Sequence, residues 1–468
     1  MSRRDIGTVA PSRRTVLLGG LGILAGGAGA TLAACAGSGS QAPAAPQGPP
    51  VTVELWQGSH PPHQQVWKTL LDRWSAKNTN VTVNGLTVPD QGTKIAAAVA
   101  AGAVPDMELT LNDLNGMVKG FFAPTDDVFK TNKVDPRKDF MPSASEAWSL
   151  KGKYWGVPLE DGATFTGFTV REDLLAKNGL KVPDKDMPFT TWDELHAFAK
   201  KAVISGPTPE TTIFGWTTIL GQIDCVVCAA MLENGQQYFD PNKGKWTFNT
   251  PGTAGILKKL FYDPTNVLNI EDTRFTNQAT PPLSATMSLR QGKVSMTWYG
   301  TGAKSEAMDA KEDAAPYITT YITPPFKGSK RMPVAEGGWG VTLLQLSKKQ
   351  DAAAKFLGWL ASDVSVGATW NGYLACRYPP RPHQLDTYPD CQGPDFVGSR
   401  RALRHHDADP SRFIGWESGG TLVGRAAMNP ILQEVHTGKT SPTQAAQLIQ
   451  EDLDRRLEKL VSDFGALK

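Results

Sequence analysis

Residues 51–57, VTVELWQ, place Val51, Val53 and Leu55 on one face of an extended chain and Thr52, Glu54 and Trp56 on the other. This alternation predicts a β-strand. A loop at 58–62 follows, and residues 63–77 carry apolar side chains at helical spacing. Strand, loop and helix in this order are the opening of a βαβ unit.

The next fifty residues continue the same alternation of elements. The valines of 81–88 predict a second strand, and the alanine-rich segment 90–103 predicts a helix that ends at Gly102 and Pro105. Residues 107–111 predict a third strand, which closes at Asn112 and Asp113. Strands that alternate with helices favour a parallel sheet in an α/β fold.

Later segments repeat this organisation. Residues 190–194, TTWDE, predict a helix with a threonine N-cap and an acidic first turn. A strand is expected at 293–299, an amphipathic helix at 349–361 and a charged C-terminal helix at 442–467. The body from residue 51 to residue 468 is long enough for two lobes.

The first 35 residues have the layout of an export signal. Paired arginines, Arg13 and Arg14, precede an apolar stretch at 16–32, and small residues lead directly to Cys35. This pattern predicts a Tat-type lipoprotein signal peptide at 1–35 and a lipid anchor on Cys35 at the outer face of the bacterial membrane. A membrane-spanning helix is the alternative, but the run is short and rich in glycine.

Residues 36–50, AGSGSQAPAAPQGPP, have no charge and no large apolar side chain, which predicts a flexible linker. The whole chain has a net charge of +2, and the first 35 residues hold four arginines and one aspartate. The remainder is therefore close to neutral, about −1, which argues against nucleic acid as a partner.

Four cysteines follow Cys35, namely Cys225, Cys228, Cys376 and Cys391. An even number in an exported chain predicts disulfides, most simply between the first two and between the last two. A redox pair at 225–228 is the alternative interpretation.

Seven modest motifs then occur in a fixed order. They are VELW at 53–56, VPD at 104–106, LKGKYWGVP at 150–158, FTTWDEL at 189–195, RQGKVSM at 290–296, EGGWG at 336–340 and the helix at 353–362. In this order the chain resembles the carbohydrate-type extracellular solute-binding proteins of ABC importers (family 1), which include maltose-binding protein. The likeness covers almost the whole chain after the linker.

The resemblance implies an α/β, two-lobed periplasmic-binding-protein-like fold. Each lobe is expected to be a mainly parallel sheet flanked by helices, with hinge crossings near 159–163, 333–337 and 381–390 and a ligand cleft between the lobes. The expected boundaries are 51–160 plus 336–385 for lobe 1, and 161–335 plus 386–468 for lobe 2. The implied partners are a small ligand and the importer's permease, with the receptor itself a monomer.

Ligands of open α/β sheets bind beyond the carboxyl ends of strands. That rule selects Trp56, Gln57, Ser59, His60, Asn112, Asp113, Glu160, Asp161, Trp298, Tyr299, Glu336, Gly338 and Trp339. The resemblance adds Trp416 and Glu417, places Asp113 at a cleft carboxylate, and places Trp298 and Trp416 at or near sugar-stacking aromatics. Arg377 is the candidate for an anionic ligand group.

Packing explains some of these residue types equally well. Trp74, Trp192 and Trp359 occupy helical positions typical of a core, and Trp56 and Asp113 have alternatives as a core cap and a helix N-cap. His60 and His63 flank two prolines with no third ligand nearby, so no metal site is predicted. The pair 405–406 is expected in a solvated loop.

Aromatic faces cover the apolar face of a sugar, and carboxylates and amides bind its hydroxyls. We therefore expect a receptor that captures a mono- or oligosaccharide or polyol and delivers it to an importer, with no catalytic residue and no cofactor. One alternative is a receptor for a glycerophosphodiester, polyamine or peptide. The other is a lipid-anchored glycan-active enzyme with paired carboxylates, although the sequence holds no nucleophile elbow, phosphate loop or metal cluster.

Overall fold

The structure is a computed structural model of the whole chain. It describes residues 49–58, 61–113, 116–117, 119–162, 167–207, 211–218, 223–240, 245–262, 285–298, 302–325, 334–335, 337–373, 380–382, 384, 400–401, 404, 412–413, 428, 430–432, 434–435 and 438–464. The predicted signal peptide, Cys35 and nearly all of the predicted linker lie outside these ranges. Within them, no helix is both long and apolar enough to cross a membrane.

The first sheet contains six strands, five of them in the order β2-β1-β3-β15-β4, and β7 also pairs with β15. The strands are β1 (Val51–Gln57), β2 (Val81–Thr87), β3 (Met107–Leu111), β4 (Phe122–Ala123), β7 (Val157–Pro158) and β15 (Trp339–Leu344). β1 pairs in parallel with both β2 and β3. The parallel pairing that the opening stretch predicts is thus confirmed for the first three strands.

β15 enters this sheet from a distant part of the chain. It lies antiparallel to β3, with Trp339 opposite Leu111 and Leu343 opposite Met107, and it is also antiparallel to β4 and β7. The sheet is therefore mixed, because one of its inner strands returns from residues more than 200 positions later and runs the other way.

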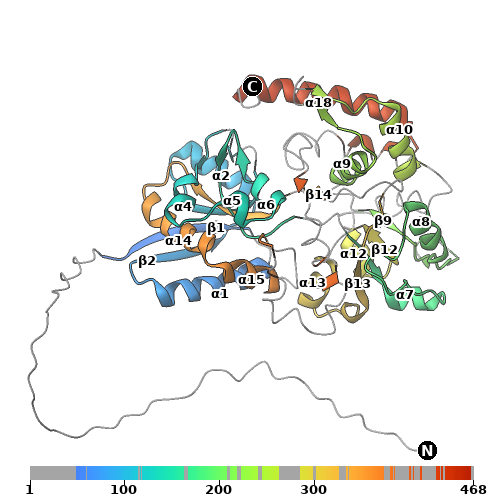
Figure 1. Cartoon of the computed structure of the whole chain (residues 1–468), viewed down its shortest axis with the longest axis horizontal. Helices are drawn as coiled ribbons and strands as arrows, with labels where there is room; N and C mark the ends of the chain where they lie inside the picture. The colour runs from blue at the N-terminus through green and yellow to red at the C-terminus, as the bar shows by residue number, and fades with distance from the viewer. Residues whose placement is uncertain are drawn as a thin grey trace, which may run out of the picture. The chain divides into compact units, whose positions relative to one another are not determined.

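Helices cover both faces of the first sheet (Figure 1). They are α1 (Pro61–Lys77), α2 (Gln91–Ala101), α4 (Asp126–Thr131), α5 (Pro136–Asp139), α6 (Pro142–Glu146), α14 (Gln350–Ser362) and α15 (Val364–Tyr373), with a hairpin of β5 (Ser149–Leu150) and β6 (Lys153–Tyr154). Val53 and Leu55 of β1 are buried with Leu70 of α1 and Phe356 of α14 in one apolar cluster. Trp74 belongs to the same cluster, with Trp359 packed against it, as the packing interpretation expects.

The second sheet has the order β13-β8-β12-β9. Its strands are β8 (Gly167–Arg171), β9 (Thr217–Thr218), β12 (Met296–Trp298) and β13 (Ile318–Ile322). β8 is buried along its whole length and runs antiparallel to both neighbours, whereas β12 and β9 are parallel. Here too the sheet is mixed rather than mainly parallel.

Further helices and short strands belong to this second half. They are α7 (Glu172–Lys177), α8 (Trp192–Lys201), α9 (Ile223–Glu233), α10 (Pro251–Leu257), a π-helix (Lys258–Tyr262), α12 (Ala285–Arg290), α13 (Gly302–Asp309), a 3-10 helix (Ala315–Tyr317), α18 (Pro442–Phe464), and β10 (Phe239–Asp240) with β11 (Lys245–Trp246). A separate pair, β14 (Val334–Ala335) with β16 (Arg412–Phe413), contacts α6 of the first half. α8 begins as predicted: the Thr191 hydroxyl accepts a hydrogen bond from the backbone N–H of Glu194 at 3.2 Å.

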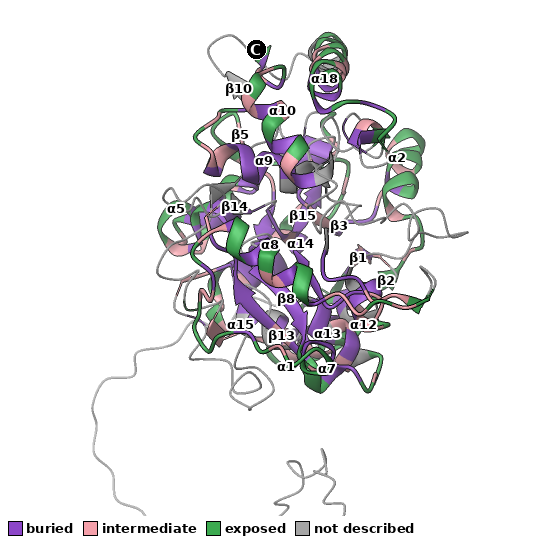
Figure 2. Ribbon diagram, turned by 90° about the vertical axis from the view of Figure 1, so that its right-hand side faces the viewer, coloured by how far each residue is buried: buried purple, intermediate pink, exposed green. Residues whose placement is uncertain are grey.

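The second half has a core of its own, separate from that of the first sheet. Phe168, Trp192, Trp216 and Trp298 meet there, and Ile449 of α18 closes it. Figure 2 shows β8 and β13 buried, while α2 and α18 turn exposed faces outward. Two sheets, each with its own apolar core, are the two halves expected of a two-lobed protein. The boundaries predicted for the lobes stay a prediction.

Candidate functional site

Three strands of the first sheet bring their polar ends to one edge. β1 and β3 are parallel, so their carboxyl ends, at Gln57 and Leu111–Asn112, lie at the same edge. β15 is antiparallel to β3, so it begins there, at Trp339. Gln57 and Asn112 are buried although both are polar. In an open α/β sheet this edge is the place for a ligand.

Two chain crossings meet at the same edge. The segment that leaves the first sheet after β7 passes the segment that enters β15. The backbone N–H groups of Leu159 and Glu160 donate to the carbonyl oxygen of Trp339 at 2.9 and 3.3 Å. Gly338 lies directly against Glu160: a Cβ at this position would be 2.1 Å from the Glu160 carbonyl oxygen. The crossing predicted near 159–163 therefore touches residues 338–339, which directly follow the crossing predicted near 333–337.

Gly337 allows the second crossing to pass close to β3. Its φ is +80°, in the left-handed region that favours glycine. A Cβ there would lie 2.6 Å from the Asn112 amide nitrogen and 2.5 Å from the Cβ of Ala147. The glycines of the EGGWG motif thus have a structural reason, since side chains would separate this crossing from Asn112 and Glu160.

Two acidic side chains of the first crossing are buried and hydrogen-bonded. The indole N–H of Trp370, on α15, donates to the Glu160 carboxylate at 3.2 Å. The Ser143 hydroxyl, on α6, donates to the carboxylate of Asp161. Each carboxylate is therefore held by a partner from a different helix.

Glu108 and Asp113 form a second pair of acids, within β3 and just after its end. Glu108 of β3 is 4 % exposed, and the Gln91 amide, in the first turn of α2, donates to its carboxylate and to the Leu109 carbonyl, both at 2.8 Å. Burial, followed by the nearby charge of Asp113, raises the pKa of Glu108 to about 8, although the Gln91 hydrogen bond opposes the rise. Glu108 is therefore largely protonated at neutral pH.

Asp113 caps the turn that follows β3, which was the alternative interpretation of this residue in the sequence. Its carboxylate accepts a hydrogen bond from the backbone N–H of Gly116 at 3.1 Å, and its carbonyl accepts from Met117 at 3.2 Å. The residue is half-buried. Its role toward a ligand stays a prediction, because one carboxylate can cap a turn and still face a ligand.

The tryptophans predicted at the site divide into two groups. Trp339 stands at the edge, half-buried, with the imidazole of His63 edge-on at 4.7 Å. Trp56 packs against an apolar cluster beneath α2, and its indole N–H donates to Glu54. Its surroundings favour the interpretation as a core cap.

Trp298 lies within the core of the second sheet. It is 1 % exposed, and its ring is tilted against that of Trp192 at 4.5 Å. A ring so enclosed offers no face to a sugar in this conformation, so the structure favours packing over the predicted stacking role.

The remaining predicted residues lie outside the described ranges: Ser59, His60, Tyr299, Glu336, Arg377, Trp416, Glu417, Cys376 and Cys391. Cys228 is fully buried on α9. The side chain of Cys225 is not among those described, so both disulfides stay predictions. Among the described residues, no group of three His, Cys, Asp or Glu side chains could hold a metal ion.

Sequence reasoning missed four residues at or behind the edge: His63, Gln91, Glu108 and Trp370. For Glu108 a signal existed, since it is a lone carboxylate between Met107 and Leu109 in a strand expected to be buried. For Trp370 there was none, because its partner Glu160 is 210 positions away.

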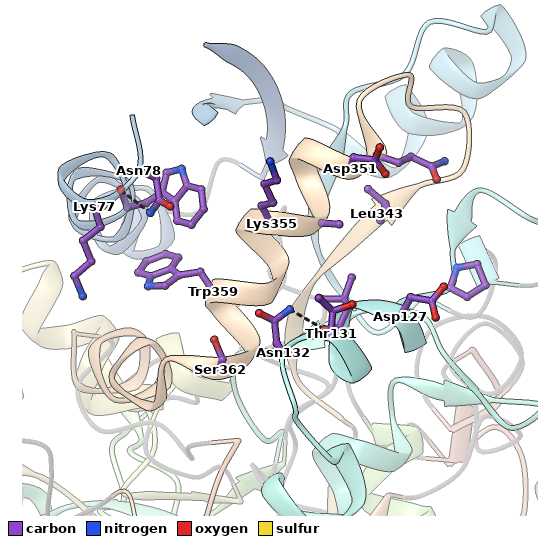
Figure 3. A pocket seen from close by; sticks show the side chains of 15 residues that line it. Lys77, Asn78, Asp127, Thr131, Asn132, Leu343, Asp351, Lys355, Trp359 and Ser362 are labelled. Carbon is purple, nitrogen blue, oxygen red and sulfur yellow. Dashed lines mark hydrogen bonds between the residues drawn. The ribbon is translucent and has the colours of Figure 1, made fainter. Parts of the chain in front are cut away.

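A groove of about 780 Å³ lies elsewhere, over α14 between the end of α1 and α4 (Figure 3). Its rim carries lysines (Lys77 and Lys355) and aspartates (Asp127 and Asp351). None of the predicted ligand residues lines this groove, so the sheet edge remains the candidate site.

Two α/β halves, joined by crossings at an edge rich in buried polar groups, define a two-lobed binding protein. Residues 57–366 match the model of the family described as bacterial extracellular solute-binding proteins. The chain belongs to this family.

Known proteins support the family and the fold. A maltotriose-binding protein of Pyrococcus abyssi (strain GE5 / Orsay) is 24 % identical over 326 residues, which make up 67 % of this chain but only 63 % of that protein. The sugar-binding protein MalE from Xanthomonas citri is 18 % identical, covers 89 % of this chain and 99 % of its own, and has a TM-score of 0.66. The GacH receptor of Streptomyces glaucescens is 20 % identical, covers 87 % and 98 %, and has a TM-score of 0.65. The predicted two-lobed α/β fold is thus confirmed.

Proposed function

We propose that this protein is an extracytoplasmic receptor that captures a sugar between its lobes and delivers it to an ABC importer. One observation carries the proposal: the buried polar residues Asn112 and Glu160 lie against Gly337 and Gly338, beside Trp339, where the two chain crossings meet. Gln57, also buried, ends the neighbouring parallel strand β1. Closure about such crossings encloses a ligand and changes the surface that a partner meets.

The chemistry of this edge suits a carbohydrate. Amide and carboxylate groups bind hydroxyls that donate as well as accept, and the half-buried ring of Trp339 can cover an apolar sugar face. The Gln57 amide oxygen is buried and has no hydrogen-bond partner among the described residues. A buried acceptor in this state costs about 1–3 kcal/mol, which a ligand hydroxyl would recover.

The names of the similar proteins point the same way. The relative from Pyrococcus abyssi is a maltotriose-binding protein, and the GacH receptor has been solved in complex with acarbose. We extend a sugar ligand to this chain on that basis, and propose that it binds without chemical turnover.

The first prediction is that a sugar or polyol stabilises the purified protein. Thermal shift and tryptophan fluorescence should be measured over maltotriose, other sugars and polyols, with glycerophosphodiesters, polyamines and peptides as comparison classes. A ligand at 100 times its Kd stabilises the folded state by about 2.7 kcal/mol. Stabilisation by a comparison class alone, or release of cleaved products, would contradict the sugar-receptor proposal.

We also propose that Cys35 carries the lipid anchor and that Arg13 and Arg14 direct export, on the strength of the sequence pattern at 12–35. In labelled cells, Cys35→Ala is expected to abolish palmitate incorporation and to move the protein from the membrane to the soluble fraction. Cys376→Ala is the control and should keep its label. Lysine at both positions 13 and 14 should retain the precursor inside the cell. Label that survives Cys35→Ala would disprove the anchor.

A further inference from the structure

We propose that Trp370 is a positioning residue of the ligand site: it holds the Glu160 carboxylate in the direction needed to bind a sugar hydroxyl. The inference rests on the proposed function. Its basis is the 3.2 Å hydrogen bond from the Trp370 indole N–H to Glu160, between side chains that are 0 % and 6 % exposed.

The main chain and the side chain of Glu160 are fixed by different partners. The backbone N–H of Glu160 donates to the Trp339 carbonyl, and Gly338 packs against its carbonyl group. The carboxylate accepts from the Trp370 indole N–H, which belongs to α15. Loss of this N–H should therefore leave the backbone contacts of the crossing in place and remove a hydrogen bond that orients the carboxylate.

Trp370 is itself held in a cluster of aromatic rings. The ring centroid of His63 lies 4.9 Å from that of Trp370, with the two rings tilted. The ring of Trp67 is edge-on to Trp370, with 5.6 Å between the centroids. His63 also contacts Trp339 edge-on at 4.7 Å. The same imidazole thus touches the ring that orients Glu160 and the ring that stands at the edge, so the acid and the aromatic surface are supported by one cluster.

The hydrogen bond is already present without ligand, so its loss lowers affinity only through the freedom that the Glu160 carboxylate regains and must lose again when the ligand binds. Ordering one such side chain corresponds to a loss of affinity of roughly threefold to tenfold. The expected effect of removing the Trp370 N–H is therefore on binding, beyond any effect on packing.

Trp67 provides a matched control within the same aromatic cluster. It is 1 % exposed, contacts Trp370, and its indole N–H has no hydrogen-bond partner among the described residues. Trp67→Phe removes the same atoms as Trp370→Phe and leaves the Glu160 contact intact. Trp67→Phe therefore measures what the loss of ring atoms from this cluster does to binding, which separates packing from positioning.

The experiment is a titration of the intact protein, Trp370→Phe, Trp67→Phe, Glu160→Ala and the double variant Trp370→Phe/Glu160→Ala with maltotriose. We expect Trp370→Phe to weaken binding about threefold to tenfold and Trp67→Phe to change it less than about twofold. In the Glu160→Ala background, which has no carboxylate for the indole N–H, Trp370→Phe should add less than about twofold. Equal losses for Trp370→Phe and Trp67→Phe, or additive losses in the double variant, would overturn the inference.

A second measurement covers the case in which Trp370→Phe fails to fold. In the intact protein labelled with ¹⁵N-tryptophan, the indole resonance of Trp370 should move on maltotriose binding and in Glu160→Gln, and a stationary resonance would overturn the inference. If the intact protein binds no sugar, the proposed function fails and the inference fails with it. If it binds normally and only the Trp370 tests fail, the inference alone is lost.

Discussion

Gly338→Ala is expected to destabilise the protein by about 3 kcal/mol and to weaken ligand binding, because a methyl group at this position would meet backbone. The added Cβ would lie 2.1 Å from the Glu160 carbonyl oxygen and 2.7 Å from its carbonyl carbon. Neither atom can move without separating the two crossings, whose hydrogen bonds from Leu159 and Glu160 to Trp339 would lengthen. Thermal melts and a maltotriose titration measure the two effects.

Gly255→Ala is the matched control. Gly255 lies in α10, and a Cβ there would meet nothing within 4 Å. In a helix interior, alanine is favoured over glycine by roughly 0.5–1 kcal/mol. The two alanine substitutions should therefore change the melting temperature in opposite directions. Equal melting temperatures for the intact protein and Gly338→Ala would show that the crossings do not need this close approach.

Glu108→Gln is expected to remove a pH-dependent loss of stability that this one residue causes. The pKa of Glu108 is about 8 in the folded protein against an ordinary 4.5, chiefly because of burial. Between these values the folded chain keeps a proton that the unfolded chain has lost. Stability therefore falls by about 1.4 kcal/mol per pH unit as pH rises, and the loss is complete above about pH 8.

Urea unfolding of both proteins from pH 5 to pH 9 measures the effect. The advantage of Glu108→Gln should grow with pH and reach on the order of 4 kcal/mol above pH 8. The glutamine keeps an oxygen that can accept from Gln91. Asp113→Asn is a cross-check: it removes a charge that raises the Glu108 pKa, so the transition of an otherwise intact protein should move to lower pH. A difference between Glu108→Gln and the intact protein that does not vary with pH would refute the buried-acid account.

Much of the fold could be predicted because its signals are local. The alternation of VTVELWQ, the helical spacing after residue 63 and the threonine cap of 190–194 each depend on neighbours in sequence, and β1, α1 and α8 form where they indicate. The direction of β15 could not be predicted in this way. Its antiparallel pairing with β3 depends on how the chain returns from the second half, which no local pattern encodes.

The candidate site was predictable to the extent that strand ends determine it. Asn112, Glu160 and Trp339 do come together, because β15 begins beside the end of β3, and Gln57 ends the parallel strand β1 at the same edge of the sheet. The burial of each side chain could not be predicted in this way. Trp298 follows the strand-end rule, yet its ring packs on Trp192 from α8, a helix about a hundred residues away in sequence.

The late return of β15 also has a consequence for the order of synthesis. A growing chain that has reached residue 330 has made β1, β2, β3, β4 and β7 but lacks the strand that joins β3 to β4 and β7. Until residue 344 is available, β3 has an unpaired edge, and such edges invite wrong partners. The first sheet is therefore completed only after all four strands of the second sheet have been made, so a truncated N-terminal fragment would lack a strand of its own sheet.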